Sequence, residues 1–261
     1  MLLASFPLAL VWMALVLQGS VAFDWRIFAE APDRIHGDLY AVTDTYAYRY
    51  SPVLAYLLGP LTALGPWVWR AAIVGAALAL PTWPMRVAVL FSWPLWFDIQ
   101  HGGTVTFALL LAAWALRGNR YAAFGYLVLV LLIPRPLFLP AAGWLLWRDR
   151  SLWRPFALMF AGHALAVLAT GWGPEWIARL VGSSDETGSI WNLGPSRIIG
   201  AWWLLIGVPL AAWLTWKGRL GWASLAVSPY LLPYYFMFLV LGAHGSVSVY
   251  SLMLRKSTSE L

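Results

Sequence analysis

Asp24 is the acidic residue best placed to do chemistry, because residues 1–23 carry no charge at all. Residues 2–23 are predicted to form a first membrane helix, with Asp24 at the point where that helix leaves the lipid. Partial removal from water, together with the negative C-terminal end of the helix, should make this carboxylate a stronger proton acceptor. These are properties of a general base. A carboxylate that only marks the membrane interface is the alternative.

Arg135 is the second candidate, since it is the only charged residue between Tyr121 and Trp147. It lies between Pro134 and Pro136 in an apolar stretch. A charge inside a membrane is costly unless paired, so its default interpretation is functional. The guanidinium group can bond two phosphate oxygens at once. We therefore predict a ligand for a lipid phosphate, the alternative being a structural arginine that extends toward the interface.

Two polar stretches supply further candidates. In the first, Tyr48, Arg49 and Tyr50 precede a Ser-Pro pair, and Arg49 is a second phosphate candidate unless it simply stacks on the tyrosines. In the second, Gln100 and His101 precede a Gly-Gly-Thr helix start and are expected to bond donor phosphate or sugar hydroxyls. Tyr48 and Tyr50 are expected to contact donor or acceptor. A solvated loop histidine is the alternative for His101.

A polar loop over residues 172–197 completes the candidate site. Asn192 and Arg197 are expected to contact the acceptor, with Trp191 stacking on a sugar ring, although a loop with a helix cap at Ser196 fits equally well. No His, Asp or Glu set has metal-ligand spacing, and the chain contains no Cys. We therefore predict no metal and no resident cofactor.

The composition indicates which elements hold these residues. The 261 residues are 61% hydrophobic and 11% charged, with a mean hydropathy of +0.71, whereas soluble domains contain about 25% charged residues. At about 20 residues per crossing, the length allows about eight to ten membrane or re-entrant helices. The predicted fold is an all-α polytopic membrane protein with one integral domain, 1–261, and a helical bundle over 52–254.

Charge distribution predicts the topology. Short cytoplasmic loops collect Lys and Arg, so the basic stretches 117–120, 148–154 and 217–220 are expected inside, and the loops 24–51 and 172–197 outside. The net charge of +6 is therefore attributed to topology and not to nucleic-acid binding. Apolar segments are expected over 52–64, 66–80, 84–97, 102–116, 121–133, 136–147, 155–171, 198–216 and 221–243. Prolines should break several of them, and one of the first three should be re-entrant.

The N-terminal pattern resembles a known superfamily. A helix, a helix-exit Asp24-Trp25, an acidic loop and then Tyr48-Arg-Tyr-Ser-Pro52 is similar to the polyprenyl-phosphate-sugar-dependent glycosyltransferases of the GT-C superfamily. The closest resemblance is to the bacterial mannosyltransferases of glycosyltransferase family 87 and to the first mannosyltransferase of GPI-anchor synthesis. The stretch 98–104 resembles the polar turn before a Leu-rich helix, and 134–139 resembles a Lys-Pro turn with Arg135 in place of Lys. The resemblance covers residues 1–150.

The resemblance implies a membrane glycosyltransferase in which Asp24 is the general base. Such an enzyme moves a sugar, mannose or another hexose, from a polyprenyl phosphate to a lipid or glycan hydroxyl on the extracytoplasmic side of the cell membrane, with inversion. The donor arrives from the membrane lipids, so no nucleotide-binding motif is needed, and the sequence contains none. Two alternatives remain: a small-molecule or lipid-sugar transporter or flippase, and a truncated, non-catalytic relative.

Overall fold

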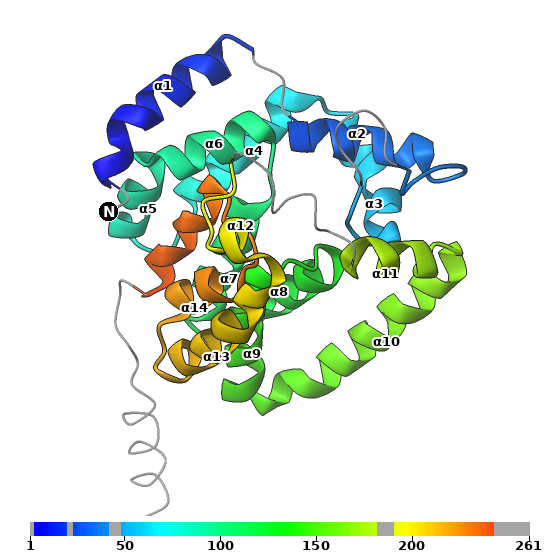
Figure 1. Ribbon diagram of the computed structural model, residues 1–261. Helices are drawn as coiled ribbons and strands as arrows, with labels where there is room; N and C mark the ends of the chain where they lie inside the picture. Colours follow the sequence, from blue (N-terminus) through cyan, green and yellow to red (C-terminus); the bar gives the residue numbers. More distant parts are fainter. Residues whose placement is uncertain (1–2, 20–22, 42–47, 182–190, 243–261) are drawn as a thin grey trace, which may run out of the picture.

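The computed structural model describes residues 3–19, 23–41, 48–181 and 191–242. Every regular element in these ranges is an α-helix or a 3-10 helix (Figure 1), which confirms the all-α class. Among the described residues, one helix, Arg150–Thr170, is long and apolar enough to cross a membrane alone. The helices Pro52–Thr62 and Pro66–Leu78, which meet at 105°, are a second candidate if they form one broken span.

The α-helices follow in the order α1 (Phe6–Leu17), α2 (Phe23–Arg34), α3 (Pro52–Thr62), α4 (Pro66–Leu78), α5 (Trp83–Leu90), α6 (Trp93–His101), α7 (Val105–Ala115), α8 (Arg120–Leu132), α9 (Leu139–Arg148), α10 (Trp153–Thr170), α11 (Gly173–Val181), α12 (Ser196–Ile199), α13 (Trp203–Trp216) and α14 (Leu220–Val227). The 3-10 helices are η1 (Leu3–Ser5), η2 (Pro136–Phe138), η3 (Arg150–Leu152), η5 (Gly200–Trp202) and η6 (Pro233–Gly242).

The first helix is shorter than the predicted helix over 2–23. α1 ends at Leu17, and Gly19 follows with a φ of +76° while its N–H donates to the Val16 carbonyl. A left-handed glycine of this kind ends helices. Asp24 therefore lies in the first turn of a new helix, α2, so the predicted loop 24–51 begins with helix. The argument from a negative helix end is wrong, because the N-terminal end of α2 carries positive partial charge and stabilises an anion.

Most prolines that were expected to break helices begin them instead. Pro66, Pro84, Pro94, Pro136 and Pro140 each occupy the first or second position of a helix. Proline is favoured there because its fixed φ suits a helix and the N–H that it lacks would have no partner. One consequence is that the predicted segment 84–97 is two helices, α5 and α6.

η6 lies at the centre of the packing. It contacts α5, α6, α7 and α14, while α1 packs on α6, α2 on α3, and α13 on α14. Most side chains of η6 are buried, including Tyr234, Tyr235, Met237 and Phe238. Ten residues is long for a 3-10 helix, which rarely exceeds three or four. Its first tyrosines enter the candidate site from the centre of the protein.

α10 runs along the outside of this packing, and α11 follows at its far end (Figure 1). Large apolar side chains project from α10 without cover: Leu158, Phe160, Leu165 and Leu168 are 57–75% exposed. Such a helix needs an apolar environment that the described part of the chain does not supply.

Candidate active site

Asp24 and Asp98 present their carboxylates to the same point beside Gly103. A side chain added to Gly103 would overlap the Oδ1 atom of Asp98 and lie 3.6 Å from the Oδ2 atom of Asp24. Both oxygens are buried, and neither has a hydrogen-bond partner within the described chain. Because Gly103 has no side chain, Asp98 Oδ1 occupies the place that a Cβ atom would take, and the Asp24 carboxylate lies close to the same point.

The turn between α6 and α7 positions Asp98. Gly102 ends α6 in the left-handed conformation, with a φ of +72°. The chain then turns so that Thr106, in the first turn of α7, donates to Asp98 Oδ2 from its backbone N–H at 3.0 Å and from its hydroxyl at 2.6 Å. Asp98 is fully buried and satisfies one of the N–H groups that a helix start leaves without a partner. These bonds fix Oδ2 and leave Oδ1 directed toward Gly103.

Arg135 is buried among tyrosine hydroxyls. Its backbone is extended between α8 and η2, as expected for a residue that precedes proline. Nη1 donates to the hydroxyls of Tyr234 and Tyr235, both at 3.2 Å, and Nη2 donates to Tyr50 at 2.5 Å. The guanidinium carbon also lies 5.5–5.8 Å from the centres of these three rings. Within the described chain Arg135 forms no direct ion pair; its guanidinium is hydrogen-bonded to hydroxyls, and the Asp98 carboxylate acts on it only through a longer-range Coulombic interaction.

The carboxylates and Arg135 belong to one polar cluster. Asp24 and Arg135 both lie within Coulombic range of the Tyr234 hydroxyl and of the Asp98 carboxylate. The Tyr234 ring also packs against Phe97 of α6, with ring centres 5.8 Å apart. Asp24 and Arg135, on which the sequence interpretation chiefly depended, thus share Asp98 and Tyr234 as electrostatic neighbours. They come from α2 and from the α8–η2 turn, while Asp98 comes from α6 and the tyrosines from η6.

The remaining residues of the first polar stretch differ in their placement. Tyr50 contacts Arg135 directly, as described above. Tyr48 is fully buried, and its hydroxyl donates to the Ser51 carbonyl at 2.8 Å, so its position is explained by local structure. Arg49, which lies between these two tyrosines in the sequence, is half-buried.

The two candidates of the second polar stretch, Gln100 and His101, differ in their contacts. The Gln100 side chain has a buried Oε1 atom without a hydrogen-bond partner among the described residues. His101 stacks on the ring of Phe97, with ring centres 4.0 Å apart, and its Nδ1 lies 2.8 Å from the Phe97 carbonyl oxygen. These contacts hold the His101 ring against its own helix.

The predicted acceptor residues differ in burial and contacts. Asn192 is buried, and its Oδ1 accepts from the N–H groups of Gly194 and Leu231, at 2.9 and 3.0 Å. Its amide therefore joins the segment before α12 to the segment before η6, which is a structural role. Trp191 packs on Phe97, with ring centres 5.2 Å apart, and Arg197 is exposed on α12.

Two features of the cluster were missed by the sequence analysis. Asp98 was noted within a turn but not as a site residue, although it is the only acidic residue between Asp44 and Asp149. A lone acid in a long apolar region is the signal that identifies it. The sequence Pro233-Tyr-Tyr235 was expected to break the last apolar segment and either to line a lipid groove or simply to pack. Its contact with Arg135, about a hundred residues earlier in the chain, had no comparable signal. Across the described ranges, no group of three or more His, Asp or Glu side chains is arranged to hold a metal ion.

Comparison with known proteins gives no further guidance. No protein-family model, no curated protein and no solved structure matches this chain.

Proposed function

We propose that this protein is a membrane glycosyltransferase that moves a hexose, such as mannose, from a polyprenyl phosphate to a lipid or glycan hydroxyl. The observation that carries the proposal is the polar cluster itself. It combines an Asp24 carboxylate oxygen that has no hydrogen-bond partner among the described residues, the neighbouring Asp98, and the guanidinium of Arg135, which forms no direct ion pair with them. A proton acceptor near a buried cation is the minimum that such a transfer requires.

Each residue has a defined part in the proposed reaction. The acceptor oxygen attacks the anomeric carbon while the bond from that carbon to the phosphate oxygen breaks, and the bonding electrons leave with the phosphate. Asp24 Oδ2 takes the acceptor's proton. Arg135 binds the departing phosphate, and Asp98, held by Thr106, lies beside Asp24 next to Gly103. Attack from the face opposite the phosphate inverts the anomeric centre.

The hydrogen bonding of Arg135 supports a phosphate ligand over a purely structural role. Three neutral tyrosine hydroxyls orient the guanidinium without cancelling its charge. A buried cation without a paired anion is costly, and an anionic ligand removes that cost. A donor phosphate is an anion that would reach a buried site in a membrane protein by way of the lipid.

The exposed surface of α10 supports a membrane location. The helix Arg150–Thr170 has 21 residues, and only 11% of its most apolar window is buried, whereas the core helix of a soluble protein would be covered. At about 1.5 Å per residue it extends about 30 Å, the thickness of the hydrocarbon core. Its first end lies beside the basic residues 148–154, and its second end leads to Glu175 and the turn that contains Asp38. This arrangement favours a cell-membrane protein with the basic end inside.

The decisive experiment is transfer by the purified protein from a radiolabelled polyprenyl-phosphate hexose, comparing wild type with Asp24→Asn. General base catalysis is worth about 10²–10⁴-fold, so we expect a loss of that size with unchanged thermal unfolding. The matched control is Asp33→Asn, an exposed acid on the same helix, which should retain full activity. Equal activity in Asp24→Asn would remove Asp24 as the base. Movement of the intact donor across vesicles, without transfer by the wild type, would favour a carrier.

Topology has its own test, because the chain contains no Cys. Single cysteines at Asp38 and Arg150 should react differently with a membrane-impermeant reagent, and only the first should be labelled from outside. The reverse pattern would place the acidic end in the cytoplasm and contradict an outward-facing site.

A further inference from the structure

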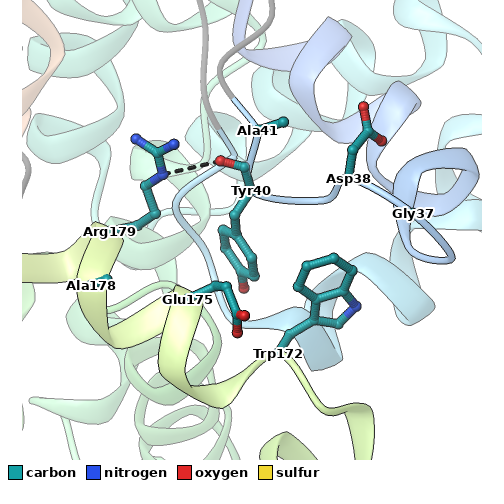
Figure 2. A pocket seen from close by; sticks show the side chains of 8 residues that line it. All are labelled: Gly37, Asp38, Tyr40, Ala41, Trp172, Glu175, Ala178 and Arg179. Carbon is teal, nitrogen blue, oxygen red and sulfur yellow. Dashed lines mark hydrogen bonds between the residues drawn. The ribbon is translucent and has the colours of Figure 1, made fainter.

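A second site lies away from the polar cluster, between the turn that follows α2 and the start of α11. This pocket has a volume of about 510 Å³ and is lined by Asp38, Tyr40, Trp172, Glu175 and Arg179 (Figure 2). Its size falls within the range of sites that hold small ligands. None of the predicted site residues lines it.

The walls of the pocket are held together by contacts between distant parts of the chain. The Trp172 indole N–H donates to the Ile35 carbonyl at 3.0 Å, and the Arg179 Nε–H donates to the Tyr40 carbonyl at 3.0 Å. The rings of Tyr40 and Trp172 meet edge to face, with centres 5.8 Å apart. The pocket is therefore formed before any ligand arrives, which reduces the entropic cost of binding.

The side chains around the pocket combine an aromatic surface with hydrogen-bonding groups. The half-buried Trp172 presents an indole ring beside the carboxylate of Glu175, whereas the carboxylate of Asp38, at the edge of the pocket, points away from Trp172 (Figure 2). Carboxylates accept hydrogen bonds from hydroxyls, and the terminal nitrogens of Arg179 are donors. An indole ring covers an apolar face well. A ligand with a C–H face and a rim of hydroxyls satisfies all of these groups.

The charges favour an uncharged ligand. Asp38 forms an ion pair with Arg34 at 3.6 Å, and the pocket contains one further acid, Glu175, and one further base, Arg179. The formal charges of these four side chains cancel, so neither a cation nor an anion has an excess of opposite charge to pair with.

Tyr40 connects this pocket to the polar cluster. Its hydroxyl donates to the Tyr50 carbonyl at 2.8 Å, and Tyr50 contacts Arg135. Burial, and to a lesser extent the Glu175 carboxylate, raise the pKa of Tyr40, so the hydroxyl stays protonated and keeps this bond. The Tyr40 ring therefore lines the pocket, and its hydroxyl bonds the backbone of Tyr50, whose side chain contacts Arg135.

We infer that this pocket binds an uncharged saccharide ring, stacked on Trp172 and hydrogen-bonded to Glu175 and Arg179. Its role as the subsite for a sugar unit of the acceptor rests on the proposed transferase function; binding of the sugar itself does not. The ring reaches the pocket either as part of a free glycan or as the headgroup of a glycolipid.

The test is saturation-transfer NMR and calorimetry on the full chain, purified in a detergent without a sugar headgroup. The probes are methyl α-mannopyranoside and maltose for a free glycan, and octyl α-mannopyranoside for a glycolipid. We expect millimolar or tighter binding of at least one probe, weakened at least about tenfold in Glu175→Gln and in Trp172→Ala. Stronger binding of the octyl compound would identify a lipid-linked source, and equal binding of the two mannosides a free one.

Matched variants keep the result interpretable. Glu30→Gln makes the same change at an exposed position on α2 outside the pocket and should bind like wild type. Trp172→Phe retains an aromatic ring and should bind with intermediate affinity even if Trp172→Ala unfolds. Unchanged binding in Glu175→Gln and Trp172→Phe, or no binding of any probe to the wild type, would overturn the inference.

Asp24→Asn separates this inference from the proposed function. The variant should bind the saccharide like wild type while it loses transfer. Absence of transfer in the wild type, with saccharide binding that depends on Glu175, would reject the transferase and leave the pocket. If the wild type transfers sugar but binds no saccharide probe, and the Trp172 and Glu175 variants keep its transfer rate, the saccharide pocket is rejected and the transferase function stands.

Discussion

Gly103→Ala should disable the polar cluster without altering any charged residue. The added methyl group would overlap Asp98 Oδ1, lie 3.1 Å from Asp98 Cγ and lie 3.6 Å from Asp24 Oδ2. The φ of Gly103 lies outside the left-handed region, so the backbone itself tolerates alanine. The carboxylate of Asp98 must therefore move, and the added methyl group comes into van der Waals contact with the Asp24 carboxylate.

The expected cost follows from what holds Asp98. Overpacking of a buried site costs about 1–3 kcal/mol. Thr106 fixes Asp98 Oδ2 through two hydrogen bonds, so the carboxylate cannot turn away without losing at least one of them. A hydrogen bond to a charged group is worth about 1.5–3 kcal/mol. We expect the free energy of unfolding to fall by about 1–3 kcal/mol if both bonds survive, and by more if one breaks.

The assay is chemical unfolding in detergent together with sugar transfer at saturating donor. Gly143→Ala is the matched control, because Gly143 lies within α9 and an added side chain there meets nothing within 4 Å. Alanine should stabilise that helix by up to about 1 kcal/mol. Transfer should drop at least tenfold in Gly103→Ala only. Wild-type stability and activity in Gly103→Ala would refute the claim that the two carboxylates lie against Gly103.

Three further changes have defined outcomes. Arg135→Lys keeps the charge but cannot bond three tyrosine hydroxyls in the same geometry. The KM for the donor should therefore rise at least about tenfold, while the KM for the acceptor should stay within about twofold. Steady-state kinetics in which each substrate is varied in turn measure both values. The Ser151 hydroxyl lowers the pKa of Asp149, so Asp149 contributes stability above the unfolded-state pKa of about 3.9 and loses it as pH falls through the folded-state value. Asp149→Asn should accordingly lower the thermal midpoint slightly at pH 7 but not near pH 3, as followed by circular dichroism. Gly207→Ala would press a methyl group onto the Ala226 carbonyl where α13 meets α14. The free energy of unfolding should fall by about 1–3 kcal/mol, while transfer per folded molecule stays unchanged. An unchanged free energy of unfolding would contradict the close approach of these helices.

The sequence predicted helices best where prolines and polar residues separate apolar runs. The expected segments 121–133 and 136–147 correspond to α8 and to η2 with α9. The Pro134-Arg135-Pro136 sequence is the reason, because it forces extended backbone between two helix-forming stretches. Arg135 was therefore correctly placed in a turn between helices.

Where the prediction failed, a local stop signal was outweighed by hydropathy. Gln18-Gly19 interrupts the first apolar run, and a glycine after a periodic segment is a typical helix end. Continuous hydropathy concealed this break, so the helix was extended to Phe23 and Asp24 was assigned to the wrong helix end. Asp24 stays a prediction as a site residue, but the electrostatic reason given for it was not correct.

Asp98 and the tyrosines mark the limit of what one sequence can predict. The position of Asp98 depends on a turn at Gly102 and on the first N–H groups of α7, which can be inferred locally. That Tyr234 lies beside Arg135 depends on how η6 packs against α6, α7 and α14. Such packing follows from the complementary shapes of distant side chains, which periodicity and composition do not encode.

The partners of Arg135 come from positions 50, 234 and 235, so its surroundings are completed only when the last described helix has docked. During synthesis the N-terminal parts of a chain emerge first. A ribosome-bound intermediate that ends before Pro233 would already contain both carboxylates and the arginine, yet two of the three hydroxyls that orient the guanidinium would be missing. Maturation of the cluster is thereby coupled to the final stage of assembly, and early termination products should lack a correctly oriented cation.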